Sequence, residues 1–427
     1  MATIKPFRAL RPREDLAEKI AALPYDVYSG EEARKVVENN PYSFLKIDRA
    51  ETQLREGIDL YSEEVYRCAA DTLNGMIERG EFLREEKPCF YIYELTMNGR
   101  VQTGIGACAS VRDYERHVIR KHENTRQEKE DDRTRHVAAC GAQTGPIFLA
   151  YRYDEQIALL QKEAKEKPAV YDFTSEDGIR HRMWVIRDEQ VIRQLENLFN
   201  HIPVMYIADG HHRAASAVRV AEKMRVEQTR KEQIRPEEKQ KENDPNHAVK
   251  LPEYEYFLSV IFADCDLLVM DYNRWVRDLN GMSEGEFLEK LRKEFRITLL
   301  NGKAHPGEKG QFTMYLNHRW YLLEEMDMPE RSDPIASLDV SVLQNHVLHP
   351  LLGIENPKTD HRISFIGGIR GLQALEELVD QEGGVAFAMY PTSMGELFAV
   401  ADEGKLMPPK STWFEPKLRS GLLIHSI

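Results

Sequence analysis

The chain has 427 residues, of which 42% are hydrophobic, and its 58 basic against 71 acidic side chains give a formal net charge of −13. This length predicts two or three domains, each able to bury a core without disulfides or structural metals. The acidic balance argues against a general nucleic-acid binder or a protein held to anionic lipid. The five cysteines form no CxxC pair, and the chain has no signal-like or membrane-length apolar run, so we expect a reduced, cytoplasmic protein.

The first third of the chain carries two helix signals and one hairpin signal. A capping box at Ser29 begins the first predicted helix, and a second helix is expected over 62–80. Two strand-like runs within 89–111 flank the dipeptide Asn98-Gly99. Because Asn-Gly supplies the positive φ angles of a tight turn, this segment predicts a β-hairpin.

The middle of the chain alternates charged and apolar runs. Residues 113–135 are dense in charge and are expected to be a solvated loop or helix. The apolar run 204–208 predicts a buried strand, and the sequence DGHHR and an alanine-rich helix follow it directly. Residues 222–243 are almost wholly polar, which predicts an exposed helix face and then a solvated loop that begins near Pro236.

The last third of the chain again mixes strands and helices. It contains a predicted strand at 363–366, a glycine-containing loop at 367–371 and a strand at 385–390. A helix capped by Ser393 and closed by Gly404 follows. The whole pattern predicts an α/β (α+β) protein with an amino-terminal subdomain at 1–84, a core with a charged insert at 85–265 and a carboxyl-terminal α/β lobe at 266–427.

The run from Asp209 to Arg213 is the strongest candidate for chemistry. A strand that ends in Asp-Gly and begins a helix directs free backbone N–H groups and the positive end of the helix dipole at one point, where anions bind. Asp209 can hold a metal or accept a hydroxyl proton, while His211, His212 and Arg213 add donors for phosphate oxygens. The alternative is a turn whose polar residues only cap a helix.

Three further segments are weaker candidates. Glu123 begins a charged cluster and could act as a general base, although such clusters are usually solvated faces. Lys410, Ser411 and Thr412 are typical phosphate partners, although they also fit an exposed proline turn. The loop 367–371 lies between a strand and a helix, but it lacks the GK[ST] ending of a Walker A loop and fits a simple tight turn.

At DGHHR the sequence resembles the free serine kinases, whose fold is similar to the ParB and sulfiredoxin nucleotide-binding domains. Three stretches carry this resemblance in the same order: His122-Glu123, the strand with DGHHR, and AFAMYPTSMGELFAVADEGKLMPPKST. Along most of its length the chain also resembles a large bacterial and archaeal family of unknown function. That second resemblance includes PFRALRP and LPYDV near the start and STWFEPKLRSGL at the end.

The resemblance implies a ParB-like nucleotide-binding core and phosphoryl transfer from ADP or ATP, with Mg²⁺, to the hydroxyl of free L-serine. By position, Glu123 resembles the general base and Asp209 the acidic residue near Mg²⁺ and substrate. The other matching residues are those of the phosphate-binding turn, Gly210, His211, His212 and Arg213, and those of a second phosphate-facing segment, Lys410, Ser411 and Thr412. The insert between Glu123 and Asp209 is much longer than in the compact kinases, so we expect a reshaped amino-acid pocket.

Other functions of the same fold remain open. A non-catalytic nucleotide sensor or regulatory protein would keep the phosphate-binding turn without the base, and a hydrolase or nucleotidyltransferase could use the same cleft. Sulfiredoxin chemistry is not expected, because the chain has His211 where that chemistry needs a cysteine. DNA partitioning is not expected either, since the chain is acidic and shows no helix-turn-helix signature. The partners that the resemblance implies are a nucleotide and a small hydroxylated amino acid, and neither nucleic acid nor a membrane is expected as a partner.

Overall fold

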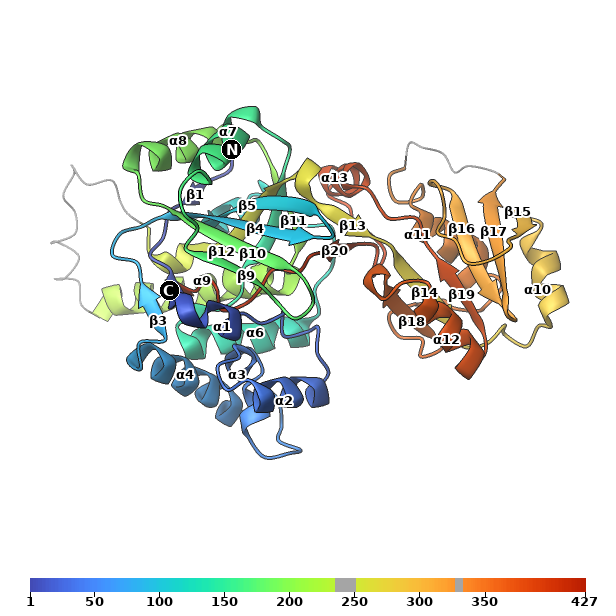
Figure 1. Cartoon of the computed structure of the whole chain (residues 1–427), viewed down its shortest axis with the longest axis horizontal. Helices are drawn as coiled ribbons and strands as arrows, with labels where there is room; N and C mark the ends of the chain where they lie inside the picture. The colour runs from blue at the N-terminus through green and yellow to red at the C-terminus, as the bar shows by residue number, and fades with distance from the viewer. Residues whose placement is uncertain (235–250, 327–332) are drawn as a thin grey trace. The chain divides into compact units, whose positions relative to one another are not determined.

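The computed structural model describes residues 1–234, 251–326 and 333–427. The chain divides into two compact units: Met1–Asp266 together with Pro416–Ile427 form unit 1, and Leu267–Glu415 form unit 2. Figure 1 shows that each unit contains its own β-sheet with helices around it. The last residues of the chain thus return to the unit that contains the first ones. The division into a subdomain at 1–84, a core at 85–265 and a lobe at 266–427 stays a prediction.

In the described residues, unit 1 is built on a mixed nine-stranded sheet with the order β6-β11-β8-β12-β5-β4-β10-β9, and β1 pairs with β5. The pairs β6–β11 and β8–β12 are parallel, and the other neighbours are antiparallel. The strands are β1 (Ile4–Lys5), β4 (Phe90–Met97), β5 (Arg100–Ser110), β6 (Ile119–Arg120), β8 (Ile147–Tyr151), β9 (Tyr171–Thr174), β10 (Arg180–Ile186), β11 (Met205–Asp209) and β12 (Tyr256–Ala263).

Helices and two short strand pairs complete unit 1. The short pairs are β2 (Leu10–Pro12) with β3 (Phe82–Arg84), and β7 (Ala142–Gln143) with β21 (His425–Ser426). The helices are α1 (Ala17–Ile20), α2 (Gly30–Asn39), α3 (Leu45–Asp48), α4 (Glu63–Glu78), α5 (Val111–Glu115), α6 (Gln127–Cys140), α7 (Glu155–Ala164), α8 (Glu189–Phe199) and α9 (His211–Ile234). In Figure 1, α7 and α8 lie at one side of the sheet and α2 to α4 at the opposite side.

The local signals in unit 1 are confirmed. Ser29 and Glu32 form the predicted capping box at the start of α2, and α4 occupies the second predicted helix. The strands β4 and β5 pair antiparallel around Asn98-Gly99, and both turn residues have positive φ. The loop expected at Pro236 lies outside the described residues.

The core of unit 1 explains how α9 is held. Its buried residues Ala214, Ala217, Val218 and Ala221 recur at intervals of three and four positions and join the main apolar cluster of the sheet. Because these side chains are small, the helix axis lies close to the strands. The amino end of α9 is therefore fixed by packing along the first three turns of the helix.

In the described residues, unit 2 contains a six-stranded antiparallel sheet with the order β15-β17-β16-β19-β14-β18, and a separate pair, β13 with β20. The strands are β13 (Leu268–Met270), β14 (Tyr272–Val276), β15 (Phe295–Leu299), β16 (Gln311–Leu316), β17 (Arg319–Glu325), β18 (Ile363–Gly367), β19 (Val385–Ala388) and β20 (Trp413–Glu415). The helices are α10 (Glu284–Leu291), α11 (Asp339–Leu343), α12 (Gln373–Glu382) and α13 (Met394–Asp402).

The mixed α/β class and the carboxyl-terminal α/β unit are confirmed by these two sheets. The strand expected over 385–390 is shorter, because the backbone N–H of Met389 donates to the side chain of Asn273 at 2.9 Å and Pro391 follows soon after. The capping box of Ser393 with Glu396 is present at the start of α13. In the described parts of the chain, no helix has both the length and the apolar sequence that a membrane crossing requires.

Candidate functional site

The sequence Asp209-Gly210-His211 forms a strand–turn–helix junction. The ladder between β11 and β8 shifts register between Ile207 and Asp209, so a β-bulge precedes the turn. Gly210 has φ +87, a value that favours glycine, and α9 begins at the next residue. The carbonyl of Gly210 accepts the first α-helical hydrogen bond from Ala214 at 3.0 Å. The bulge reorients the end of the strand, and the glycine lets the chain turn directly into the helix.

Both carboxylate oxygens of Asp209 are engaged at this junction. Oδ1 accepts a hydrogen bond from the backbone N–H of Gly210 at 2.7 Å, and Oδ2 lies 2.8 Å from Nζ of Lys417. Burial by itself raises the pKa of Asp209, but the nearby charges of Lys417 and Arg213 hold that pKa well below its usual range. The carboxylate is therefore ionised at neutral pH, and its side chain is still 43% exposed.

Two buried histidines lie beside the turn. The rings of His122 and His211 meet edge to face, with their centroids 4.5 Å apart. Burial lowers the pKa of His122 to about 4, and burial together with the neighbouring His122 lowers the pKa of His211 well below its ordinary value. Both imidazoles are therefore neutral at pH 7. In the part of the chain that the structure describes, Nε2 of His211 is buried and has no hydrogen-bond partner.

Glu123 lies next to this turn. Its Oε2 atom is 4.0 Å from Nδ1 of His211, and its side chain is 38% exposed. The loop that carries it is tied to the same helix, because the backbone N–H of Arg126 donates to Nε2 of His212 at 3.1 Å. Glu123 and the DGHHR run therefore come together across the long insert.

The charged run 113–135, whose last part lies in α6, is not wholly solvated, and this part of the prediction is wrong. Asp132 and Arg133 are both buried and form an ion pair at 3.0 Å. Asp132 also accepts a hydrogen bond from the hydroxyl of Tyr66 at 3.0 Å, and the Arg133 guanidinium lies 4.2 Å from the ring centre of Tyr25. Pairing and aromatic contact offset the cost of burying these charges, which composition alone does not reveal.

Lys417 is a site residue that sequence reasoning missed. It belongs to the final stretch STWFEPKLRSGL, in which only the family resemblance marks the sequence as unusual. This stretch crosses the site because Ser420 pairs with Ala22 through two backbone hydrogen bonds and the N–H of Gly421 donates to the carbonyl of Thr144 at 3.3 Å. The family resemblance of LPYDV and of STWFEPKLRSGL is the signal that could have indicated this residue, since Tyr25 lies near Arg213 and Lys417 contacts Asp209.

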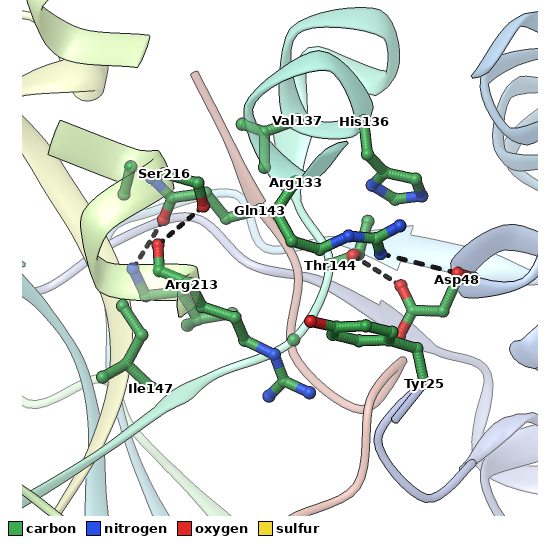
Figure 2. A pocket seen from close by; sticks show the side chains of 13 residues that line it. Tyr25, Asp48, Arg133, His136, Val137, Gln143, Thr144, Ile147, Arg213 and Ser216 are labelled. Carbon is green, nitrogen blue, oxygen red and sulfur yellow. Dashed lines mark hydrogen bonds between the residues drawn. The ribbon is translucent and has the colours of Figure 1, made fainter. Parts of the chain in front are cut away.

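A small cavity of about 30 Å³ lies beside the amino end of α9. Figure 2 shows Arg213 from α9 and Arg133 from α6 extending toward Tyr25. On one wall the hydroxyl of Thr144 donates to Asp48 at 2.8 Å. Burial raises the pKa of Tyr25 to about 12, so its hydroxyl stays protonated. The cavity therefore combines two guanidinium groups with the carboxyl group of Asp48 and with hydroxyls.

Lys410, Ser411 and Thr412 belong to unit 2, whereas Glu123 and the DGHHR turn belong to unit 1. Lys410 has φ +58, and its carbonyl accepts a hydrogen bond from the buried Arg274 at 3.0 Å. The hydroxyl of Ser411 donates to the carbonyl of Pro408 at 2.7 Å. These contacts hold the segment as an ordered turn, and its predicted role in phosphate binding stays a prediction.

The glycine loop 367–371 fits the tight-turn alternative. A Cβ on Gly368 would stand 2.1 Å from Oδ1 of Asp271, so the glycine makes room for a neighbouring side chain. The N–H of Gly368 also donates to the carbonyl of Asp271 at 2.8 Å. The loop thus serves packing between β14 and β18.

The residues at the turn suit a metal ion only in part. In residues 1–234, 251–326 and 333–427, no group of three or more His, Cys, Asp or Glu side chains could hold a metal ion. Mg²⁺ often binds through one or two carboxylates together with substrate phosphates and water. Asp209 fits such a single-carboxylate role, on condition that Lys417 releases Oδ2.

Fold and site together describe a mixed α/β protein whose candidate site lies where a buried strand passes through an Asp-Gly turn into a helix. The chain belongs to DUF1015, a family described as proteins of unknown function, whose model matches residues 4–341. Comparison with curated protein sequences finds no match.

Several solved structures are similar at low scores. A free serine kinase variant in complex with AMP is 12% identical, with 76% of this chain and 92% of that chain covered and a TM-score of 0.35. SbnI with a carboxyl-terminal truncation, from Staphylococcus aureus, is 12% identical, with coverages of 75% and 87% and a TM-score of 0.38. A conserved hypothetical protein from Pyrococcus furiosus is 13% identical, with coverages of 76% and 95% and a TM-score of 0.34. At these scores the function must be argued from the residues of this chain.

Proposed function

We propose that the site around the DGHHR turn transfers a phosphoryl group from ADP or ATP to the hydroxyl of a small molecule, with free L-serine as the first acceptor to test. The observation that carries the proposal is the meeting of Glu123, His211 and Asp209 at the amino end of α9. A partly exposed carboxylate there lies next to a helix end that attracts phosphate. Phosphoryl transfer needs this combination of a proton acceptor and oriented positive charge.

In the proposed reaction Glu123 accepts the proton of the acceptor hydroxyl. The hydroxyl oxygen then forms a bond to the terminal phosphorus of the nucleotide, and the bond from that phosphorus to the bridging oxygen breaks. The products are the phosphorylated acceptor and AMP or ADP. Glu123 suits this role because its side chain is 38% exposed, so a substrate can reach it.

The positive groups at the turn would bind the phosphates of the nucleotide. The backbone N–H groups at the start of α9 and the ammonium of Lys417 oppose the negative charge of the transferring group. Asp209 keeps Lys417 in place through the 2.8 Å contact. Nε2 of the neutral His211 offers either a donor or an acceptor, depending on its tautomer.

Mg²⁺ would enter this site together with the nucleotide. Asp209 is the residue that would hold it, as a single carboxylate beside the phosphates. A bound Mg²⁺ would neutralise charge on the phosphate oxygens. Lys417 would then turn from Asp209 toward those oxygens.

The Glu123→Gln variant separates a kinase from a nucleotide sensor. For a kinase we expect transfer to fall by about 100-fold or more, because general base catalysis contributes roughly 10²- to 10⁴-fold. The affinity for ADP, measured by isothermal titration calorimetry, should stay within about twofold of the wild type. Glu128→Gln is the matched control, since Glu128 is on the same loop-to-helix segment and contacts Tyr61. Wild-type protein that binds ADP without transfer to any acceptor would favour the sensor.

A further inference from the structure

Arg419 lies two positions after Lys417, in the last stretch of unit 1. Its side chain is only 5% exposed, and its guanidinium group forms an ion pair with Asp177. The same group donates hydrogen bonds to Oγ of Ser175 at 3.0 Å and to Nε2 of His181 at 3.4 Å. This buried cation thus has a carboxylate of its own, apart from the one that Lys417 contacts.

The carboxylate that pairs with Arg419 lies in an ordered turn between β9 and β10. The backbone N–H of Ser175 donates to the carbonyl of Ile179 at 2.9 Å and closes the turn. Inside it, the hydroxyl of Ser175 donates to Oδ1 of Asp177 at 2.6 Å. The Asp177 carboxylate is therefore fixed by its own turn before Arg419 contacts it, and the turn serves as an anchor for the end of the chain.

His181 fixes the direction of the same guanidinium group. Its ring is 1% exposed, and Nδ1 lies 2.8 Å from the hydroxyl of Tyr93. Burial, together with the charge of Arg419, lowers the pKa of His181 to about 3, so the ring is neutral at pH 7. Because a guanidinium only donates, Nε2 of His181 is the acceptor and Nδ1 carries the proton. Arg419 thus meets a neutral acceptor and a carboxylate in fixed positions.

Little backbone separates this anchor from Lys417. Two positions span at most about 7 Å of extended chain, and the residue between them, Leu418, is buried. On the other side of Arg419, Ser420 pairs with Ala22 through backbone hydrogen bonds. The backbone that carries Lys417 is therefore held on its carboxyl-terminal side, where Arg419 supplies the nearest charged side-chain contact.

From these contacts we propose that Arg419 is a positioning residue, which holds Lys417 at Asp209 so that the Lys417 ammonium is in place for the phosphates of the nucleotide. The inference rests on the proposed function, in which that ammonium opposes the charge of the transferring group. Without the anchor, the backbone at Lys417 gains freedom and its ammonium spends less time beside Asp209. Phosphate binding must then order this segment, at a cost in conformational entropy.

Acetylation of lysines in the full chain tests the position of Lys417 without any nucleotide. An ion pair favours the protonated amine, which does not react, so a paired lysine is acetylated slowly, and mass spectrometry gives the rate at each lysine. In Arg419→Gln protein we expect Lys417 to react about fivefold faster, the factor that corresponds to one partly exposed ion pair. Lys165, which pairs with Glu94, is the internal reference, and its rate should stay within about twofold of the wild type.

A double-mutant cycle on ADP affinity tests whether Arg419 acts through Lys417. Arg419→Gln should weaken ADP binding about fivefold in otherwise wild-type protein, and by less than about twofold in Lys417→Met protein. The second loss is small because a residue that acts only through Lys417 has no further effect once Lys417 is replaced. Isothermal titration calorimetry measures the four affinities. Equal losses in the two backgrounds would contradict the proposal, since a general loss of structure acts in both.

Two further variants complete the test, and thermal unfolding reports whether each is folded. Arg180→Gln removes an exposed ion pair with Asp172 from the same hairpin and should leave the labelling of Lys417 and the ADP affinity unchanged. Asp177→Asn removes the carboxylate at a side chain that is 42% exposed, and it should also speed the labelling of Lys417. An unchanged rate at Lys417 in folded Arg419→Gln or Asp177→Asn protein would overturn the proposal. If wild-type protein does not bind ADP, the proposed function fails, while the labelling rates still decide whether Arg419 positions Lys417.

Discussion

Nζ of Lys417 lies 2.8 Å from Oδ2 of Asp209, although 208 positions separate the two residues in the sequence. The contact joins the last segment of the chain to the amino end of α9 within unit 1. It also keeps Asp209 ionised, since Lys417 is the main charge that lowers the pKa of this carboxyl. The end of the chain is therefore part of the candidate site.

Replacing Lys417 tests this relationship. Lys417→Met should weaken ADP binding by about tenfold or more, because a charge-assisted contact to phosphate is lost. The free energy of unfolding should fall by only about 1 kcal/mol, since the remaining carboxylate is partly solvated. Calorimetric titration and urea denaturation measure the two effects. Lys87→Met, at an exposed position, is the control, and equal ADP affinity in both variants would contradict the role of Lys417.

Replacing Asp209 tests the turn itself. Asp209→Ala should abolish transfer, because the variant loses both the anchor of Lys417 and the single carboxylate available for Mg²⁺. The fold should remain, since the side chain is 43% exposed and the packing of α9 on the sheet is unchanged. Transfer assays and far-UV circular dichroism check the two statements. A folded Asp209→Ala protein with wild-type transfer would exclude this turn as the active site.

The buried histidine His122 predicts a pH dependence of stability. Its folded pKa is about 4, against an ordinary value of 6.5, so between these values the unfolded chain binds more protons than the folded chain. Above pH 6.5 this histidine does not change the free energy of unfolding. As the pH drops from 6.5 toward 4, its contribution lowers the free energy of unfolding by about 1.4 kcal/mol per pH unit.

The His122→Gln variant isolates that contribution. The pH dependence of its unfolding free energy should be flatter between pH 6 and 4.5, with a slope lower by roughly 1 kcal/mol per pH unit. Urea denaturation at several pH values provides the measurement. The exposed residue His117 offers the control substitution His117→Gln. A slope identical to that of the wild type would show that the pKa of His122 in the folded protein is close to its ordinary value.

The buried ion pair of α6 predicts a large effect on stability. Arg133→Met leaves Asp132 buried without its cationic partner, and we expect a loss of about 3–5 kcal/mol in the free energy of unfolding. Arg79→Met, which removes an exposed pair with Glu81, should cost less than about 1 kcal/mol. Chemical denaturation compares the two variants, and equal losses would mean that the Arg133 pair is effectively solvated.

The sequence was most informative where structure depends on neighbouring residues. The turn at Gly210 and the capping box at Ser29 were predictable, because the backbone angles and hydrogen bonds involve adjacent positions. The nearness of Glu123 to the turn came from the order of motifs in the resembling family, and no local pattern required it. Family resemblance therefore supplied the long-range part of the prediction.

Contacts across long sequence distances were not predictable from local patterns. Lys417 reaches Asp209 because the chain end pairs with Ala22, and this pairing has no local signature. The sequence predicts Arg133 on a solvated face, but the ring of Tyr25, from the turn between α1 and α2, lies over its guanidinium group. Patterns of hydrophobicity report exposure along one element, and they do not report which distant aromatic or acidic group meets a charge.

Phosphoryl transfer at the DGHHR turn is tested most directly by ³¹P NMR of the purified chain with Mg²⁺, ADP or ATP, and a panel of hydroxylated amino acids. We expect a new phosphomonoester resonance for at least one acceptor, with an equal loss of the terminal phosphate of the donor. Nucleotide resonances that shift or broaden with protein, without any phosphorylated acceptor, would contradict phosphoryl transfer and favour a nucleotide sensor.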